Sequence, residues 1–210
     1  MFKKWLYFVL DILSPLKCIG CGKEREILCG VCAAKSQLAQ PIKLGSIYSA
    51  ANYHDRVIKK AIWLLKYRGA RSVAEPLAKL IHARLLSRLP DAQNYIIVPL
   101  PLHSKRLRER GYNQSWLLAK NLSDKFKIPL VDNVLYKIKN TPSQVSIKNR
   151  AERLKNLNDS FSAKNIHLIK SGSVILIDDV TTTGATINEA ARVLKDSGAK
   201  KVIGFTVARD

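Results

Sequence analysis

The sequence predicts an α/β fold, in which helices flank a parallel β-sheet, with a small cysteine-rich segment before it. Short apolar runs alternate with longer amphipathic runs along most of the chain, which is typical of βαβ units. All four cysteines fall between positions 18 and 32. The length of 210 residues suits one domain of ordinary size with a small appendage.

The expected strands and helices follow one another in alternating order. Strands are expected at 46–53, 95–98, 133–139, 173–178 and 200–208. Helices are expected at 55–69, 72–89, 115–126 and 184–198. Asp55 is expected to start the first helix and Gly69 to stop it. A basic loop follows the second strand, and a long polar connection spans 140–161. We therefore divide the chain into an N-terminal helix and metal-binding segment, 1–45, and one α/β domain, 46–210.

The charge of the chain is strongly basic and unevenly distributed. Its 36 Lys and Arg against 16 Asp and Glu give a formal charge of +20. Residues 51–170 carry +16 of this charge, whereas residues 171–210 are neutral. A broad basic face favours a polyanionic partner such as nucleic acid, a membrane surface or a phosphorylated ligand, although a solubilising surface has the same charge. The apolar content of 47% excludes a disordered chain.

The N-terminus carries an apolar run from Trp5 to Leu13, preceded by two lysines. Asp11 interrupts this run and no small-residue cleavage site follows it, which argues against a signal peptide. The run is also too short for a membrane span. We expect an amphipathic helix that packs on the protein or on a membrane surface. Because no other segment is apolar enough to cross a bilayer, we expect a cytoplasmic protein.

The four cysteines form two closely spaced pairs, in the pattern Cys18-x2-Cys21-x7-Cys29-x2-Cys32. Four thiolates at this spacing suit a tetrahedral structural zinc ion and leave no open position for catalysis. Metal binding would then supply the folding energy of a segment too short to bury a core. Two redox CxxC motifs and an iron–sulfur cluster are the alternatives, but a reducing cytoplasm disfavours stable disulfides.

The stretch SVILIDDVTTTGAT, residues 173–186, joins an apolar run, two adjacent acids and a turn rich in threonine. In an open parallel sheet, ligands bind where strands end and helices begin. The turn offers hydroxyl groups and the N-terminus of the next helix, which together favour a phosphate. Asp178 and Asp179 offer acceptors for sugar hydroxyls or for hydrated Mg²⁺. The stretch therefore predicts a site for a ribose phosphate.

The two adjacent acids also allow a simpler interpretation. Neighbouring side chains of an ideal strand face opposite ways, so both acids reach one ligand only if the chain is already turning. Alternatively, Asp179 caps the following helix and the threonines merely fill a tight turn. We favour the ligand site, because capping needs one acid rather than two.

The stretch resembles the phosphoribosyl pyrophosphate (PRPP) motif of type I phosphoribosyltransferases. In that family the acids hold the ribose hydroxyls of PRPP, which binds with Mg²⁺, and the following loop holds its 5′-phosphate. The resemblance implies that Asp178 and Asp179 are both the catalytic residues and ligands of PRPP. It implies further PRPP-binding residues in the loop, which are Thr182, Thr183, Gly184, Ala185 and Thr186.

Two basic segments have counterparts in related transferases. The loop after the strand at 95–98 corresponds to their pyrophosphate loop, where Arg or backbone donors stabilise the leaving pyrophosphate. The candidate residues there are Leu102, His103, Lys105 and Arg106. Residues 141–157 resemble the mobile loop that closes over PRPP and shields it from water. The alternatives are a solvated helix start for the first segment and an exposed basic helix for the second.

Nearly the whole chain resembles the ComF (GntX-like) family. The matching pieces are the CxxC pairs, LKYRG, VPLPLHSKRLRERGYNQ, TPSQ with NRAERLKNL, and the PRPP motif. ComF proteins are linked to DNA uptake in natural transformation, where single-stranded DNA enters the cytoplasm. The resemblance implies a protein that binds PRPP with Mg²⁺ and handles that DNA, with competence or DNA-import proteins as further partners.

An active phosphoribosyltransferase of nucleotide or base metabolism is the alternative function, in which an acceptor attacks C1′ of PRPP and expels pyrophosphate. We identify no base-recognition element in the sequence. Aromatic residues near basic ones can stack on the bases of single-stranded DNA, although Trp63 also has the helical spacing of a core residue. These aromatic residues are Trp63, Tyr67, Tyr112 and Trp116. A membrane adaptor that uses the N-terminal helix would leave the PRPP motif unexplained.

Overall fold

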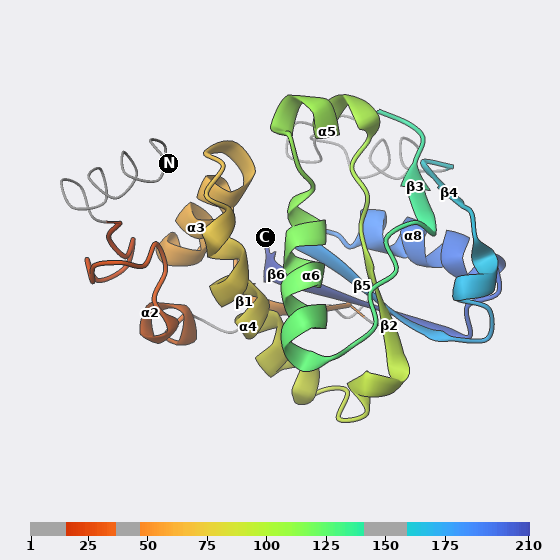
Figure 1. Ribbon diagram of the computed structural model, residues 1–210, viewed down its shortest axis with the longest axis horizontal. Helices are drawn as coiled ribbons and strands as arrows, with labels where there is room; N and C mark the ends of the chain where they lie inside the picture. Colours follow the sequence, from red (N-terminus) through yellow and green to blue (C-terminus); the bar gives the residue numbers. More distant parts are fainter. Residues whose placement is uncertain (1–15, 37–46, 141–158) are drawn as a thin grey trace, which may run out of the picture.

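The computed structural model describes residues 16–36, 47–140 and 159–210 of the chain (Figure 1). Two expected features lie outside these ranges, namely the N-terminal amphipathic helix and the closing loop at 141–157. Within the described ranges, none of the helices has the length and hydropathy needed to cross a membrane.

Four parallel strands form the central sheet, in the order β1-β6-β5-β2. Their bounds are β1 (Ile47–Asn52), β2 (Tyr95–Pro99), β5 (Ser173–Thr181) and β6 (Lys201–Arg209). The two longest strands, β5 and β6, are also the two inner ones, and most of their residues are buried. Burial on both faces explains why they are apolar almost without interruption. The predicted parallel sheet is confirmed.

The described ranges contain four longer helices (Figure 1). They are α3 (Arg56–Tyr67), α4 (Ala74–Leu86), α6 (Gln114–Phe126) and α8 (Ala185–Asp196). Of these, α4, α6 and α8 pack on this sheet, and α3 contributes to the same core as α4. Asp55 starts α3 as predicted, because its side chain accepts hydrogen bonds from the N–H groups of Val57 and Ile58. The described residues also form shorter helical segments. These are α2 (Gly30–Ala34), α5 (Ser104–Arg110) and the 3₁₀ turns η1 (Arg71–Val73), η2 (Ala92–Asn94) and η4 (Ile166–Leu168).

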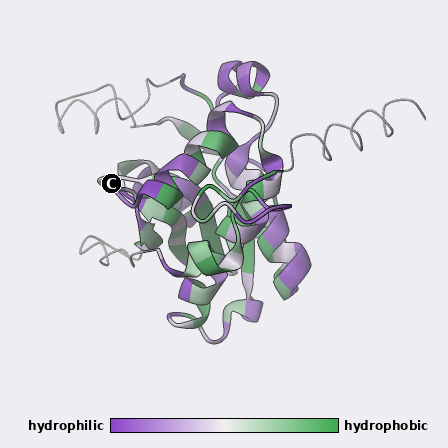
Figure 2. Ribbon diagram, turned by 90° about the vertical axis from the view of Figure 1, so that its left-hand side faces the viewer, coloured by the Kyte–Doolittle hydropathy of each residue, from purple (hydrophilic) through white to green (hydrophobic). Residues whose placement is uncertain are grey.

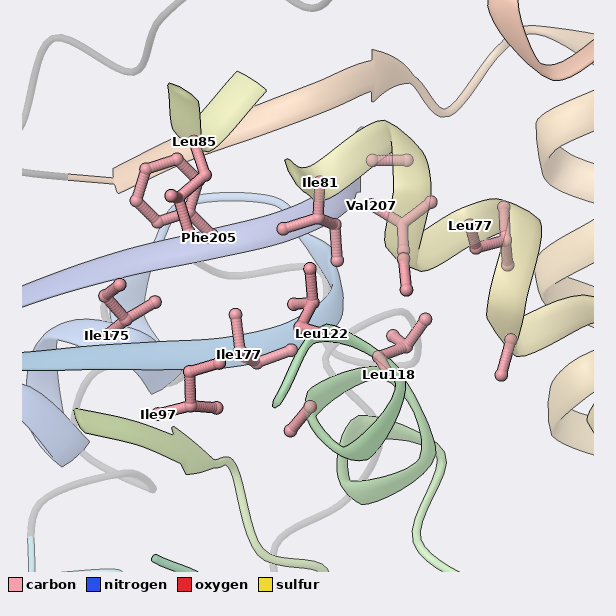
Figure 3. Packing of buried hydrophobic residues seen from close by; sticks show 14 of the residues in the cluster. Leu77, Ile81, Leu85, Ile97, Leu118, Leu122, Ile175, Ile177, Phe205 and Val207 are labelled. Carbon is pink, nitrogen blue, oxygen red and sulfur yellow. The ribbon is translucent and has the colours of Figure 1, made fainter. Parts of the chain in front are cut away.

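Alternate side chains of the inner strands enter two separate hydrophobic cores. Ile175 and Ile177 of β5 face the core that α4 and α6 cover (Figure 3). Val174 and Leu176 of the same strand face the core that α8 covers. Helices therefore cover both faces of the sheet, and its carboxyl edge is left for the candidate site.

Residues 104–110 form helix α5, where the sequence predicts a basic loop with a solvated helix start as the alternative, and that alternative is confirmed for these residues. His103 starts this helix, since its Nδ1 atom accepts a hydrogen bond from the N–H of Lys105 at 3.3 Å. Gly111, with a φ of 78°, ends it. None of its residues is buried, and its ribbon at the top of Figure 2 is mostly hydrophilic. A helix without a buried face has no apolar periodicity by which the sequence could reveal it.

The strand expected at 133–139 is shorter than predicted and lies outside the parallel sheet. Strand β3 (Leu135–Lys137) pairs in antiparallel fashion with β4 (Phe161–Ala163). Strand β4 begins at the end of the stretch expected to be a polar connection. Leu135 and Phe161 are buried in the core beneath α8, which fixes this small pair against the main sheet.

The cysteine-rich segment packs against the α/β domain. Leu28 and Ala33 are each 3% exposed and belong to the core that includes α4. Gly20 lies close to Cys32, because a Cβ atom added at position 20 would stand 2.7 Å from the Cys32 Sγ atom. Since residues 37–46 are outside the described ranges, the division of the chain between residues 45 and 46 stays a prediction.

Candidate functional site

The four cysteine Sγ atoms lie within 4.8 Å of one another, so the predicted ligands Cys18, Cys21, Cys29 and Cys32 are brought together. A tetrahedral zinc ion with Zn–S bonds of about 2.3 Å places its sulfurs about 3.8 Å apart. The Sγ atoms of Cys21 and Cys29 are 3.7 Å apart. The cluster can therefore hold one metal ion.

Backbone N–H groups point at the buried sulfurs of this cluster. Those of Gly20 and Cys29 donate to Cys18 Sγ, at 3.4 and 3.3 Å. Burial alone would raise the pKa of the Cys18 thiol, but the N–H groups of Cys29, Gly20 and Cys21 lower it to about 6. The thiolate, which is the form that binds metals, is therefore stabilised at Cys18.

A second candidate site is a cleft of about 580 Å³ at the carboxyl ends of β2 and β5. Residues of α3, α5 and the start of α6 line its walls, and Lys137 of β3 also lines it. This edge is where open parallel sheets bind ligands.

Asp178 and Asp179 both line the cleft, although β5 continues to Thr181 instead of ending at the first acid. The Oδ1 atom of Asp178 accepts hydrogen bonds from Ser115 Oγ at 2.8 Å and from the N–H of Asp179 at 2.9 Å. Asp179 is 3% exposed, and its Oδ2 atom lies 2.9 Å from Lys66 Nζ. The structure thus gives the two acids different partners, one on α6 and one on α3.

The charges at the floor of the cleft depend on one another. Burial raises the pKa of the Asp178 carboxyl to about 7; the neighbouring Asp179 adds to this rise, and Lys66 and Ser115 oppose it. Burial alone would lower the pKa of Lys66, but its ion pair with Asp179, helped by Asp178, raises that pKa overall. One ammonium therefore faces two acids, which leaves acceptor oxygens for sugar hydroxyls or a further cation.

The turn after β5 leads directly into α8. Gly184 has a φ of 79°, and a Cβ atom added there would stand 2.8 Å from Ile47 Cδ1, so this position requires glycine. Thr183 Oγ1 accepts a hydrogen bond from the N–H of Ala185 at 3.4 Å. Gly184 itself occupies the N-cap position of α8. The interpretation in which Asp179 caps this helix is therefore wrong.

The remaining predicted PRPP-binding residues divide into three groups. Four of them line the cleft together with the acids, namely Leu102, Arg106, Thr182 and Thr186. Thr183 and Gly184 lie in the turn next to it, and Ala185 begins α8. His103 and Lys105 instead begin α5, where His103 is the cap and Lys105 is exposed. The structure thus brings most of these residues to one place, while their roles stay predictions.

Several polar residues of the cleft are missing from the predicted set, among them Lys66, Arg110, Ser115 and Lys137. Lys66 lies within LKYRG, one of the segments that match the ComF pattern, and Ser115 directly follows GYNQ, the end of another, so the sequence held a signal for both. Lys137 reaches the cleft through the β3–β4 pair, which the sequence does not predict. Burial lowers the pKa of Lys137, and the nearby Arg106 adds to this effect.

Comparisons with known proteins identify relatives of this chain. A family model described as a phosphoribosyl transferase domain matches residues 113–210, which include β5, the turn and α8. Competence protein F of Haemophilus influenzae is 29% identical over 95% of this chain and 93% of its own length. DNA utilization protein YhgH of Escherichia coli (strain K12) is 29% identical over 91% of this chain and 83% of its own.

Among solved structures, one of adenine phosphoribosyltransferase aligns with a TM-score of 0.46 and 17% identity, over 68% of this chain and 73% of that chain.

Competence protein ComFC of Bacillus subtilis (strain 168) is 31% identical over 91% of this chain and 77% of its own length. At this identity and coverage, the chain belongs to the ComF family.

Proposed function

We propose that the cleft binds PRPP together with Mg²⁺ and that the protein handles incoming single-stranded DNA during DNA uptake. The observation that carries the first half is the placement of Asp178 and Asp179 in one cleft beside the turn into α8. Acceptors for ribose hydroxyls and donors for a phosphate then lie at adjacent positions of one strand–turn–helix unit. We place the protein in the cytoplasm, where four reduced thiols are stable.

The cleft residues fit the parts of PRPP as follows. Asp178 and Asp179 would accept hydrogen bonds from the ribose hydroxyls or hold hydrated Mg²⁺, as carboxylates do. The stretch from Thr182 to Thr186, which is the turn and the first residues of α8, would take the 5′-phosphate, because it combines hydroxyl groups with the N-terminus of a twelve-residue helix. Arg106 would approach the pyrophosphate. A structural zinc ion would occupy the four-cysteine cluster.

The DNA-handling half of the proposal rests on charge and on the names of relatives. Residues 51–170 carry +16, and the relatives are named as competence and DNA utilization proteins. Other competence or DNA-import proteins are further partners that this role implies.

An active transferase is the second candidate, and the extent of the cleft favours it. The lining continues from the acids to Trp63 and Tyr67 on α3, which leaves space for an acceptor beyond the ribose and phosphate positions. In this reaction the acceptor gives up a proton and bonds to C1′, while pyrophosphate leaves with the bonding electrons. Release of pyrophosphate with a free base, without saturable DNA binding, would favour this candidate.

Calorimetry of PRPP binding tests the first half of the proposal. We expect saturable binding with Mg²⁺ and a loss of binding in excess EDTA. At pH 8, above the pKa of about 7 of the Asp178 carboxyl, Asp178→Asn keeps an oxygen for both hydrogen bonds at Oδ1 but removes charge, so it should weaken binding by roughly 1.5–3 kcal/mol. The exposed Asp91, which precedes β2 at the opposite edge of the sheet, supplies the control Asp91→Asn. Equal affinity in wild type and Asp178→Asn would contradict the assigned role.

The salt dependence of DNA binding tests the second half. Affinity for a single-stranded oligonucleotide should fall as salt rises, with a slope of about −0.7 per phosphate neutralised. Arg108 is exposed on α5, whereas Arg106 and Arg110 line the cleft. Arg108→Ala should therefore flatten the slope and leave PRPP binding unchanged. A slope near zero in the wild type would show that phosphate contacts do not drive DNA binding.

A further inference from the structure

Two large aromatic side chains are exposed on one wall of the cleft. Trp63 is 43% exposed and Tyr67 is 65% exposed, and both line the cleft that holds Asp178 and Asp179. They stand four residues apart on α3, with ring centroids 6.3 Å apart and ring planes at 47°. Exposed aromatic rings beside a polar site indicate a surface for a planar ligand.

The structure separates these two residues from the other aromatic candidates. The Tyr112 hydroxyl donates a hydrogen bond to the Leu65 carbonyl, which ties α3 to the loop before α6. The indole Nε1 atom of Trp116 donates to Asp132 at 2.7 Å. Tyr112 and Trp116 are each partly buried and have structural partners, whereas the Trp63 and Tyr67 rings are exposed.

The surroundings of the two rings are strongly basic. Residues 56–71 contain six Lys and Arg and no Asp or Glu. The guanidinium carbon of Arg68 lies 5.2 Å from the Trp63 ring centroid, and that of Arg110 lies 5.6 Å from the Tyr67 centroid. Aromatic rings that alternate with guanidinium groups combine stacking with phosphate neutralisation, which is the chemistry of single-strand binding sites.

We propose that Trp63 and Tyr67 form a stacking platform for unpaired bases of single-stranded DNA, so that the strand crosses the mouth of the PRPP cleft. This proposal rests on the DNA binding proposed above and locates that binding on the α3 wall of the cleft. Because the ring planes are not parallel, the two rings cannot sandwich one base, and each offers its own stacking surface. Bases stacked there lie in the same cleft as the acids, on the wall formed by α3.

An oligonucleotide of thymidines and an abasic oligonucleotide of equal length test the platform. Both strands carry the same phosphates, so tighter binding of the thymidine strand by the wild type would come from its bases. We expect the wild type to bind the thymidine strand more tightly than the abasic strand. Tyr67→Ala removes an exposed ring and should lower affinity for the thymidine strand about tenfold, while affinity for the abasic strand stays unchanged. Trp63→Leu should act in the same direction, and Trp63→Phe should retain most of the affinity.

Tyr136→Ala is the matched control. Tyr136 on β3 is 36% exposed and has the Lys164 ammonium 5.4 Å from its ring centroid, but it is not part of the cleft lining. This variant should bind both strands like the wild type. If it lost affinity as much as Tyr67→Ala, general aromatic contacts would explain the effect and the platform would be refuted.

The other outcomes separate this proposal from the proposed function. Equal binding of thymidine and abasic strands by the wild type overturns the platform but leaves DNA binding intact. Absence of saturable binding to either strand overturns the DNA-handling function itself. Calorimetry with PRPP and Mg²⁺ should give unchanged affinity for Tyr67→Ala. A loss of PRPP affinity there would assign the ring to PRPP instead of DNA.

Discussion

Replacing Cys29 by serine is expected to release the metal from the four-cysteine cluster and to unfold the segment around it. The Sγ atom of Cys29 lies 3.7 Å from that of Cys21 and accepts a hydrogen bond from the N–H of Cys32. Structural zinc contributes about 10–16 kcal/mol of binding free energy in zinc-finger peptides, and there it is folding free energy. Because Leu28 lies in the main core, the melting temperature of the whole chain should fall as well.

Metal analysis of protein purified without chelator checks this prediction. The wild type should hold close to one zinc ion per chain, and Cys29→Ser should hold almost none. Val31→Ser is the control, since Val31 lies on α2 between Cys29 and Cys32 and is 63% exposed. It should retain the metal. An iron absorption spectrum, or two disulfides in the freshly purified protein, would support one of the alternative interpretations of the cysteine pattern.

The fold was largely predictable because its main signals are local. Each inner strand is a short apolar run, and Asp55 marks the start of α3 by hydrogen bonds to residues two and three positions ahead. The strand at 133–139 was harder to predict with the right length and pairing, because the three residues of β3 pair with a segment more than twenty positions away. Helix α5 buries none of its residues, so hydrophobic patterning could not reveal it.

The candidate site was predictable where its residues are adjacent in sequence. Asp178, Asp179 and the following threonines belong to one strand and one turn, so their spacing alone indicates a ligand site. The partners of the two acids come from elsewhere in the chain. Ser115 is 63 positions from Asp178, and Lys66 lies on α3. Only the packing of α6 on the sheet and of α3 in the shared core brings these groups together, so the ion pair could not be predicted.

Lys66→Met is expected to destabilise the protein by about 3–5 kcal/mol, the usual cost of removing one partner of a buried ion pair. The side chains of Lys66 and Asp179 are 20% and 4% exposed, and Asp178 stands beside them. Without the ammonium, the charges of two neighbouring, poorly solvated carboxyl groups repel each other with no cation between them. Asp179→Asn should cost less, because Lys66 keeps the attraction of Asp178. The free energy of unfolding from urea titrations measures both effects.

The pH dependence of Lys66→Met and a double mutant identify the cause of this loss. Lys66 lowers the pKa of Asp178, which burial nevertheless raises to about 7. Removing Lys66 raises that pKa further. When the pKa of an acid is higher in the native state than in the unfolded state, the protein loses stability as the pH rises from the unfolded toward the native pKa. The destabilisation should therefore be larger at pH 8 than at pH 5. The double mutant Lys66→Met/Asp179→Asn should lose less than the two single mutants combined.

Lys79→Met supplies the matched control for the loss of a lysine. Lys79 Nζ pairs with Glu75 at 3.2 Å, but both side chains are about half exposed. Exposed pairs contribute roughly 0–1 kcal/mol, so this variant should unfold almost like the wild type at both pH values. If Lys66→Met were equally mild, or its effect did not grow with pH, the ammonium of Lys66 would not be what holds the two acids of the PRPP motif together at the floor of the cleft.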